Sequence, residues 1–344
     1  MSKITKAILT GGGRATRLRP LTSTINKHLI PLANQPMIFY AIEKAVEAGI
    51  KEIYINTNPG EVQLQNQVGD GSRWGIKIEY FEQTGGPQGI AHVVKLAEKF
   101  VGDESFMFYL SDNIVLGTLK PFIKKFEEEK LDCLLTMSKV ADPSQFGVAQ
   151  FDAAGKLTDI LEKPQNPPSD MAVTGIYLYN KSFFKAFDQI QKSARGEYEI
   201  SDIHSYLLKN GYKVGYQEIT GWWKDTGKPE DLILANRLLM ETNQVKVEIG
   251  KNTRQGSGVK FIAPVIIGDD CVIENCVIGP YTTLGPGTTV KNAQITNSII
   301  LDNCRIEAPI KISDSIIGKG ATVIKDDHTD FHRLLLGDQT LVEF

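Results

Sequence analysis

The chain has 344 residues, of which 42% are hydrophobic and 23% charged, and its formal net charge is −3. This is the composition of a globular protein long enough for two domains, and a net charge near zero does not favour nucleic acid or a membrane surface as a partner. No stretch approaches the roughly 18–20 apolar residues of a membrane span, and there is no apolar signal region. The cysteines form no C-x-x-C pair. We therefore expect a cytoplasmic protein with reduced cysteines.

The amino-terminal segment is basic and contains no acid before Glu43. An expected short strand at residues 7–10 runs into a loop with three consecutive glycines, followed by Arg14, Arg17 and Arg19. Backbone N–H groups of such a loop can form a concavity that binds anions, and arginine adds charge and fork geometry. The Walker pattern and the dinucleotide pattern G-x-G-x-x-G are both absent. The segment therefore predicts a site for a polyanion, most simply a nucleoside triphosphate.

Lys27 is the strongest single candidate for catalysis in this segment. Its ammonium is a compact charge suited to neutralising a phosphate during transfer, although an exposed lysine without a role is the commoner case.

Short apolar runs alternate with amphipathic stretches up to about residue 240, which is typical of an α/β domain with a mostly parallel sheet. We expect strands at residues 7–10, 52–56, 77–81 and 106–110, and helices at 36–48, 89–100 and 119–130. Ligands of such sheets lie beyond the carboxyl ends of the strands, where residues 11–19 and 111–113 fall. A hairpin is expected before the proline-rich loop at 163–168.

Two acids and one Glu-Lys pair are candidates for the chemistry around a triphosphate. Asp112 ends an apolar strand and Asp225 lies beside tryptophans and a turn glycine, so both are candidate Mg²⁺ ligands; each could instead be a simple turn former. Glu162 could accept hydrogen bonds from sugar hydroxyls, while Lys163 and Arg195 could hold a phosphate; all three are also common surface residues.

From about residue 260 the periodicity changes. Aliphatic residues recur every six positions from Ile266 through Val290, and then every five or six to Val323. Hexads of this kind predict a parallel, left-handed β-helix. We expect a nucleotide-binding domain at 1–242, a connector at 243–262, the hexapeptide-repeat β-helix at 263–325 and a terminal cap at 326–344.

These segments, in this order, resemble the sugar-1-phosphate nucleotidylyltransferases, and in particular the long form of the glucose-1-phosphate thymidylyltransferases, which ends in a β-helix. The family loop G-G-x-G-T-R-L is matched at residues 12–18, the P-K-Q-L-I-P segment at 26–31, G-D-N at 111–113 and E-K-P at 162–164. S-A-R-G-E and W-x-D-T-G follow at 193–197 and 223–227. Ala15 replaces the third loop glycine, which requires a negative φ there, and His28 replaces a glutamine.

The resemblance implies a role for each matched residue. Gly12, Gly13, Arg14 and Thr16 would contact the nucleotide, Gln83 and Gly89 its base, and Arg17 and Lys27 the triphosphate. Asp112 and Asp225 would bind Mg²⁺, the expected cofactor. The sugar phosphate would be held by Gly147, Glu162, Lys163, Val173, Tyr177 and Arg195, with Lys163 also catalytic. The implied reaction joins glucose 1-phosphate to dTTP, giving dTDP-glucose and pyrophosphate, and we expect a homo-oligomer.

Three alternatives remain open at this point. UTP could replace dTTP, because thymine and uracil differ by one methyl group. Hexapeptide β-helices also form acyltransferases, but residues 245–325 contain no histidine to serve as the usual base. A non-catalytic subunit that only binds nucleotide is the third alternative, disfavoured by the presence of Lys27, Asp112, Asp225 and Lys163.

Overall fold

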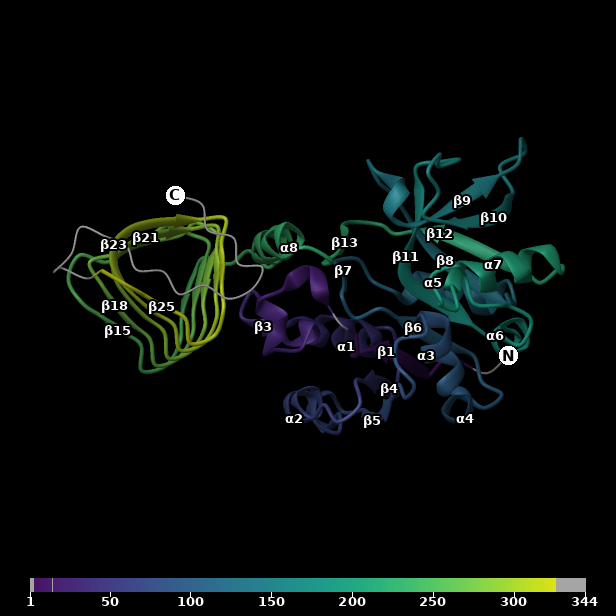
Figure 1. Cartoon of the computed structure of the whole chain (residues 1–344), viewed down its shortest axis with the longest axis horizontal. Helices are drawn as coiled ribbons and strands as arrows, with labels where there is room; N and C mark the ends of the chain where they lie inside the picture. Colours follow the sequence, from purple (N-terminus) through teal and green to yellow (C-terminus); the bar gives the residue numbers. More distant parts are fainter. Residues whose placement is uncertain (1–2, 14, 326–344) are drawn as a thin grey trace. The chain divides into compact units, whose positions relative to one another are not determined.

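The computed structural model describes residues 3–13 and 15–325 (Figure 1). The chain divides into two compact units that are interleaved in sequence. The first comprises residues 1–14 and 38–225, and the second comprises residues 15–37 and 226–344. Arg14 and the cap expected at 326–344 lie outside the described residues.

The first unit is built on a nine-stranded sheet. Its strands are β1 (Lys6–Thr10), β4 (Glu52–Thr57), β5 (Lys77–Glu82), β6 (Phe106–Tyr109), β8 (Cys133–Lys139), β9 (Gly147–Phe151), β10 (Leu157–Glu162), β11 (Met171–Tyr179) and β12 (Val214–Glu218). The order is β10-β9-β11-β6-β1-β4-β5, with β8 paired to β11 and to β12. β6, β1, β4 and β5 run parallel, and β11 is antiparallel to its neighbours. The predicted strands and the hairpin before residue 163 are all present.

The helices of this unit include the three predicted stretches, at 36–48, 89–100 and 119–130, and further helices at 63–68, 182–187 and 200–209 that were not predicted. They are α1 (Met37–Glu47), α2 (Gln63–Val68), α3 (Ile90–Leu96), α4 (Glu98–Val101), α5 (Lys120–Glu128), α6 (Ser182–Phe187) and α7 (Ile200–Lys209), with the 3₁₀ turns η4 (Ser72–Trp74) and η5 (Pro143–Gln145). The single helix expected at 89–100 is instead two short helices, because Ala97 leaves helical geometry with φ −88° and ψ 5°.

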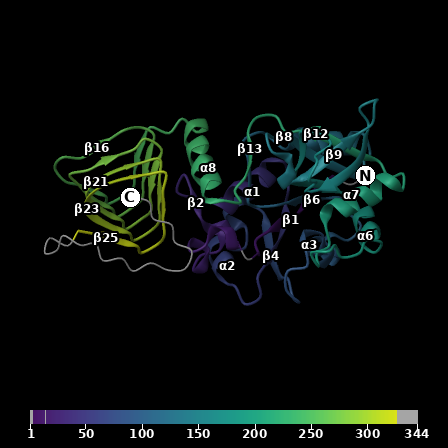
Figure 2. The same ribbon diagram turned by 45° about the horizontal axis from the view of Figure 1, so that its top comes forward.

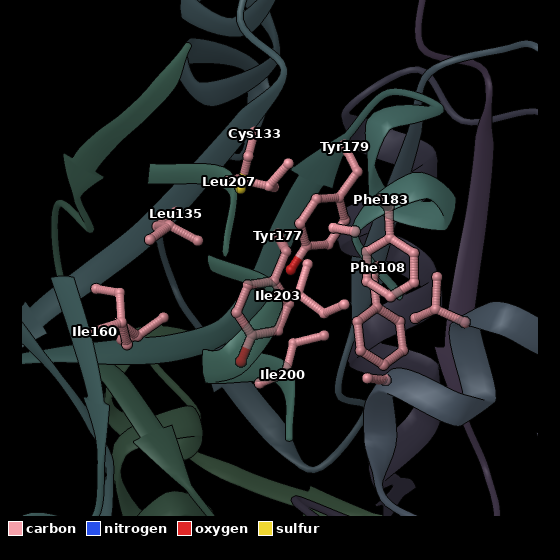
Figure 3. Close-up of a cluster of buried hydrophobic side chains, with 14 of the residues drawn as sticks. Phe108, Cys133, Leu135, Ile160, Tyr177, Tyr179, Phe183, Ile200, Ile203 and Leu207 are labelled. Carbon is pink, nitrogen blue, oxygen red and sulfur yellow. The ribbon is translucent and has the colours of Figure 1, made fainter. Parts of the chain in front are cut away.

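The core of the first unit packs aromatic side chains of the sheet against α6 and α7 (Figure 3). Tyr179, Phe106 and Phe183 are fully buried, and Tyr179 packs edge to face against Phe183 with 4.9 Å between the ring centroids. Burial of such rings contributes more than any other contact to a core of this kind. It fixes the sheet whose strand ends carry the polar residues described below.

The second unit contains a parallel β-helix (Figure 2). One run of strands is β14 (Val247–Ile249), β17 (Val265–Ile267), β20 (Thr282–Leu284), β22 (Ile299–Ile300) and β24 (Ile316–Ile317). The others are β15 (Arg254–Gln255), β16 (Lys260–Phe261), β18 (Val272–Glu274), β19 (Val277–Ile278), β21 (Thr289–Thr296), β23 (Arg305–Ser313) and β25 (Thr322–Ile324). Every pairing among them is parallel, as expected for stacked coils.

The coils differ from the sequence expectation in two details. β14, β15 and β16 lie within the predicted connector at 243–262 and pair with the next coil, although this first coil is mostly exposed and lacks the aliphatic repeat. Ile266 and Val272 are half-buried, whereas Val265, Ile267 and Ile273 enter the core. Side chains alternate along each short strand, so a register one residue away from the expected one selects the opposite side chains for burial.

Residues 15–37 belong to the second unit together with α8 (Pro229–Thr242). They form three 3₁₀ turns, η1 (Thr16–Leu18), η2 (Leu21–Ser23) and η3 (Lys27–Leu29), and a small hairpin of β2 (Pro31–Leu32) and β3 (Gln35–Pro36). None of the helices in the described part of the chain is both long and apolar enough to cross a membrane.

Candidate active site

The glycine loop follows β1 in the first unit and is tied to the end of β4. Gly11 donates its N–H to Asn56 Oδ1 at 3.0 Å, and Gly13 donates to Asn58 Oδ1 at 2.9 Å. A Cβ on Gly11 would lie 2.7 Å from the Asn56 carbonyl oxygen, and one on Gly12 would lie 2.8 Å from Asn56 Nδ2. The first two glycines are therefore required by close backbone packing, and two of the N–H groups expected to face a ligand are bonded within the protein.

The basic residues after the loop belong to the second unit. Thr16 and Arg17 form η1 and are exposed, whereas Lys27 opens η3 and is half-buried. His28 is buried, and the Asn26 side chain accepts a hydrogen bond from its backbone N–H at 2.8 Å.

Ala15 corrects one expectation. Its φ is 43° and its ψ 39°, so the residue that replaces the third glycine adopts the left-handed conformation rather than a negative φ. This geometry costs a non-glycine residue roughly 1–2 kcal/mol. Its carbonyl oxygen accepts hydrogen bonds from the Thr22 hydroxyl at 2.8 Å and from the Leu18 N–H at 3.1 Å, which hold the strained residue in place.

A small antiparallel ladder in the first unit contains one candidate metal ligand, Asp225, and begins at the residue after the other, Asp112. β7 (Asn113–Val115) pairs with β13 (Trp223–Asp225), and Asp225 lies opposite Asn113, the residue next to Asp112. The ladder starts where β6 ends, and the Ser111 N–H donates to Thr10 Oγ1 at 2.8 Å, which joins it to the end of β1. Strand pairing thus brings together two acids that are far apart in sequence.

Asn113 connects the elements around these aspartates. Its side chain is 3% exposed, and its Nδ2 donates to Asp112 Oδ1 at 3.0 Å. Its Oδ1 accepts hydrogen bonds from the Trp223 indole N–H at 2.8 Å and from the Gly175 N–H at 3.1 Å. Both of its polar atoms are occupied, so Asn113 fixes the orientation of the Asp112 carboxylate relative to β11 and β13.

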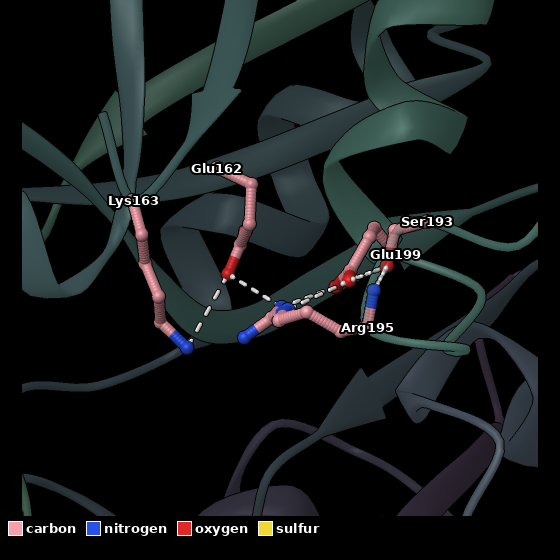
Figure 4. A network of polar contacts seen from close by, with 5 residues as sticks. All are labelled: Glu162, Lys163, Ser193, Arg195 and Glu199. Carbon is pink, nitrogen blue, oxygen red and sulfur yellow. Dashed lines mark hydrogen bonds and ion pairs between the residues drawn. The ribbon is translucent and has the colours of Figure 1, made fainter. Parts of the chain in front are cut away.

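A second polar cluster forms around Glu162 (Figure 4). Glu162 Oε1 lies 3.5 Å from Lys163 Nζ and 3.6 Å from an Arg195 terminal nitrogen. Gly147 lies opposite Glu162 in the β9–β10 hairpin, and a Cβ on Gly147 would lie 3.6 Å from Glu162 Oε2 and 3.9 Å from Val173 Cβ. Five of the predicted sugar-phosphate residues therefore meet at one place.

Arg195 is held by a carboxylate that sequence analysis did not single out. Glu199 binds Arg195 through two hydrogen bonds of 2.7 and 3.1 Å and accepts a third from the Ser193 hydroxyl at 2.6 Å. The Arg195 side chain stays 47% exposed while that of Glu199 is 10% exposed. Glu199 thus orients the Arg195 guanidinium, which remains exposed enough to bind an anion.

Tyr177 lies deeper than the other members of this group. It is 4% exposed and stacks against Phe108. Burial raises the pKa of its hydroxyl well above the usual range, and the nearby charge of Glu162 adds to this effect. Burial likewise raises the pKa of the Asp202 carboxyl, with Glu199 and Glu162 as further causes. The Tyr177 hydroxyl therefore stays protonated and is a hydrogen-bond donor, not a base.

The predicted base contacts Gln83 and Gly89 lie at the two ends of one loop in the first unit. Gln83 follows β5, and its N–H donates to the Thr57 carbonyl oxygen at 3.1 Å. Gly89 has φ 90°, and a Cβ there would lie 2.9 Å from the Tyr198 nitrogen, so no other residue fits. The loop therefore packs against the segment that carries Arg195 and Glu199.

The sequence matches the models of two known protein families. The nucleotidyl transferase model matches residues 6–242, more than half of the chain. The chain belongs to the nucleotidyl transferase family. A second model, the GMPPB C-terminal domain, matches residues 261–342.

Relatives of this nucleotidyltransferase extend over its whole length. It is 38% identical to the low-salt glycan biosynthesis nucleotidyltransferase Agl11 of Haloferax volcanii, over 97% of this chain and 99% of the relative. It is 34% identical to a glucose-1-phosphate thymidylyltransferase of Streptomyces griseus, over 97% of this chain and 98% of the relative. These matches identify it as an enzyme of the sugar-1-phosphate nucleotidyltransferase class.

Solved structures agree on the fold. A crystal structure titled as a putative glucose-1-phosphate thymidylyltransferase from Bacillus anthracis, in complex with a sucrose, is 38% identical and superposes with a TM-score of 0.64, covering 68% of this chain and 94% of that chain. A UDP-glucose pyrophosphorylase complexed with UDP-glucose has a TM-score of 0.63 at 23% identity, covering 70% of this chain and 99% of that chain, and shows the shared fold alone.

The residues that hold the candidate site residues in place were not predicted from the sequence. Asn56 and Asn58 support the glycine loop, Asn113 and Trp223 support Asp112, and Glu199 supports Arg195. A signal existed for some of them: Asn56 interrupts a buried apolar strand, and Asn113 and Trp223 lie within the segments that carry the two aspartates.

Proposed function

We propose that this nucleotidyltransferase joins glucose 1-phosphate to dTTP and releases pyrophosphate, forming dTDP-glucose. The observation that carries the proposal is the cluster of Lys163 and Arg195 around Glu162, in the same unit as the Asp112–Asp225 ladder. Two cations beside one carboxylate suit a sugar phosphate, because the cations can bind the phosphate while the carboxylate accepts hydrogen bonds from hydroxyls. The full-length relatives described as glucose-1-phosphate thymidylyltransferases support dTTP and glucose as the substrates.

In this proposal each residue has a distinct role. Lys163 and Arg195 hold the sugar phosphate, and Gly147, Glu162, Val173 and Tyr177 contact the sugar. Arg17 and Lys27 bind the triphosphate and neutralise charge that develops on the leaving pyrophosphate. Gly12, Gly13, Arg14 and Thr16 contact the nucleotide, and Gln83 and Gly89 contact its base.

The two aspartates fit Mg²⁺ by their chemistry. Carboxylate oxygens are its preferred protein ligands, and magnesium usually binds one or two of them together with substrate phosphates. Among the described residues no three His, Cys, Asp or Glu side chains are grouped so that they could hold a metal ion. Bound at Asp112 and Asp225, Mg²⁺ would supply charge stabilisation at the phosphates.

The reaction needs no protein nucleophile. A phosphate oxygen of the sugar phosphate attacks the α-phosphorus of dTTP in line, the new P–O bond forms, and the bond to the bridging oxygen of pyrophosphate breaks. Because the attacking phosphate is already ionised, a general base is not required. We further propose that residues 1–242 form the catalytic part, with the β-helix from residue 263, and that the enzyme works as a cytoplasmic homo-oligomer.

A pyrophosphate-release assay tests the proposal. The enzyme is incubated with each of dTTP, UTP, ATP and GTP, crossed with several hexose 1-phosphates, with Mg²⁺ or with EDTA. We expect the fastest release from dTTP with glucose 1-phosphate, about fivefold above UTP for one methyl group, and none with EDTA. Faster turnover of UTP would refute the assigned base, and the absence of release with every pair would refute the reaction.

A further inference from the structure

The basic segment at residues 15–37 contains a tight turn with unusual backbone geometry. β2 and β3 are joined by Ala33 and Asn34, whose φ angles are 46° and 58°. Two consecutive positive φ values are typical of a type I′ turn, which suits asparagine but is unfavourable for alanine. Contacts outside the hairpin must therefore help to hold this turn.

Both turn residues are bonded to other parts of the second unit. The Ala33 N–H donates to Asn236 Oδ1 of α8 at 2.7 Å, and Asn236 is 1% exposed. Asn34 Nδ2 donates at 2.9 Å to the carbonyl oxygen of Leu284, the last residue of β20 in the β-helix. The same carbonyl accepts the Gly268 N–H of the neighbouring coil at 2.7 Å, so both of its lone pairs are used. The hairpin lies beside α8 in both views (Figures 1 and 2).

Backbone hydrogen bonds connect the anchored turn to Lys27. The Ile30 N–H donates to the Lys27 carbonyl oxygen at 3.1 Å, and the Met37 N–H donates to the Ile30 carbonyl oxygen at 3.1 Å. Residues 27–37 therefore form one hydrogen-bonded piece. Nearer to Arg17, Leu21 of η2 approaches the β-helix at Gly318, where an added Cβ would lie 3.6 Å from Leu21 Cδ1.

We infer that the β-helix of this enzyme positions its nucleotide-binding segment, with Asn34 and Asn236 as the positioning residues. The coil through Asn34, and α8 through Asn236, fix the backbone that carries Lys27, and with it the ammonium assigned to the triphosphate. This inference rests on the proposed function for its kinetic consequence, whereas the anchoring itself rests on the contacts alone. It gives the β-helix a part in handling one substrate and none in handling the other.

Asn34→Gly is the sharpest test in the full-length enzyme. Glycine accepts the left-handed turn without strain, so the substitution removes the bond to Leu284 and keeps the hairpin. Asn275→Gly is the matched control: Asn275 also has a positive φ, 50°, and donates at 2.8 Å to Asn292 within the β-helix, remote in sequence from the basic segment. Asn236→Ala removes the second anchor.

The measurements are kcat and KM for dTTP and for glucose 1-phosphate, and backbone hydrogen exchange of peptides within residues 15–37. Relative to Asn275→Gly, we expect Asn34→Gly to lower kcat/KM for dTTP by about three- to tenfold, the effect of one lost hydrogen bond. Its KM for glucose 1-phosphate should stay within about twofold, and exchange should rise in the basic segment. Asn236→Ala should act in the same direction.

Each other outcome counts against the inference. Equal kcat/KM for dTTP in Asn34→Gly and Asn275→Gly would overturn it, and so would faster exchange without a kinetic effect. Equal losses for both substrates would show a general structural defect and would overturn it as well. Inactivity of the unmodified enzyme with every substrate pair would refute the proposed function alone, and the exchange comparison would then decide whether the β-helix holds the segment.

Discussion

At the scale of single residues, the site depends on polar side chains that are fixed by other polar side chains. Asp112 is oriented by Asn113, and Arg195 is oriented by Glu199. A group that is already ordered loses less entropy when a substrate binds, so these supports favour tight and specific contacts. Asp112 and Arg195 are the residues proposed to touch substrate, whereas Asn113 and Glu199 act by orienting them.

Lys27 is expected to act directly on the transferred phosphates. Lys27→Ala should lower kcat by about 100- to 1000-fold, the range for losing one transition-state donor. Lys51→Ala, at an exposed lysine of the first unit, is the control and should leave kcat unchanged. Steady-state pyrophosphate release measures both; wild-type turnover in Lys27→Ala would reduce Lys27 to a surface residue.

Asp225 is expected to bind Mg²⁺. Asp225→Asn removes the charge but keeps one oxygen, so the Mg²⁺ concentration for half-maximal rate should rise by about tenfold or more. Asp170→Asn changes an exposed aspartate in the same unit and should not alter the titration. If the two variants gave the same Mg²⁺ curve, Asp225 would not be a ligand.

At the scale of elements, helix α7 carries a buried titratable group. His204 of α7 is fully buried, and its Nε2 lies 2.6 Å from the Tyr179 hydroxyl. Its Nδ1 has no hydrogen-bond partner within the described structure. Burial lowers the pKa of His204 to about 3, so the ring is neutral in the folded protein.

This histidine should make the first unit sensitive to acid. Between pH 6.5 and about 3 the unfolded chain binds a proton at His204 that the folded chain does not, so stability falls as the pH falls through this window. The slope is about 1.4 kcal/mol per pH unit at most. His204→Phe should flatten the fall between pH 6.5 and 5, even if its stability at pH 7 is lower. Urea unfolding at several pH values measures this, and parallel curves for the two proteins would contradict it.

At the scale of the whole molecule, the chain crosses between its two units at residues 14–15, 37–38 and 225–226. Each unit has its own core, one around the aromatic residues of the sheet and one inside the coils. The basic segment precedes most of the first unit in sequence but belongs to the second. If the segment binds nucleotide as proposed, this interleaving links that binding to the unit that contains the β-helix.

The stability of the coils should depend on their aliphatic interior. Ile278 of β19 is fully buried, whereas Ile262, one residue after β16, is 38% exposed. Ile278→Ala should lower the free energy of unfolding by about 2–5 kcal/mol, the cost of a cavity in a packed core. Ile262→Ala should cost less than Ile278→Ala, since its side chain is partly exposed and its removal leaves no closed cavity. Thermal unfolding of both variants checks this, and equal losses would contradict the assigned register.

Much of the fold could be predicted from local sequence patterns. Residues 106–109 are apolar and buried throughout, and residues 53–55 form a short apolar run between polar ends, so both were predicted as strands of a covered sheet, and the aliphatic hexads as stacked coils. Helix ends and the division at Ala97 were less predictable, because they depend on a single residue leaving helical geometry.

The candidate residues could be predicted because phosphate, sugar and magnesium each require particular side chains. The sequence alone therefore determined the class of reaction and the residue types proposed for it. Only the tertiary structure decided which of them meet: strand pairing set Asp225 opposite Asn113, and a turn with positive φ fixed Asn34 on Leu284, 250 positions away in sequence. Contacts of this kind depend on three-dimensional proximity between distant segments, which no local pattern of residues encodes.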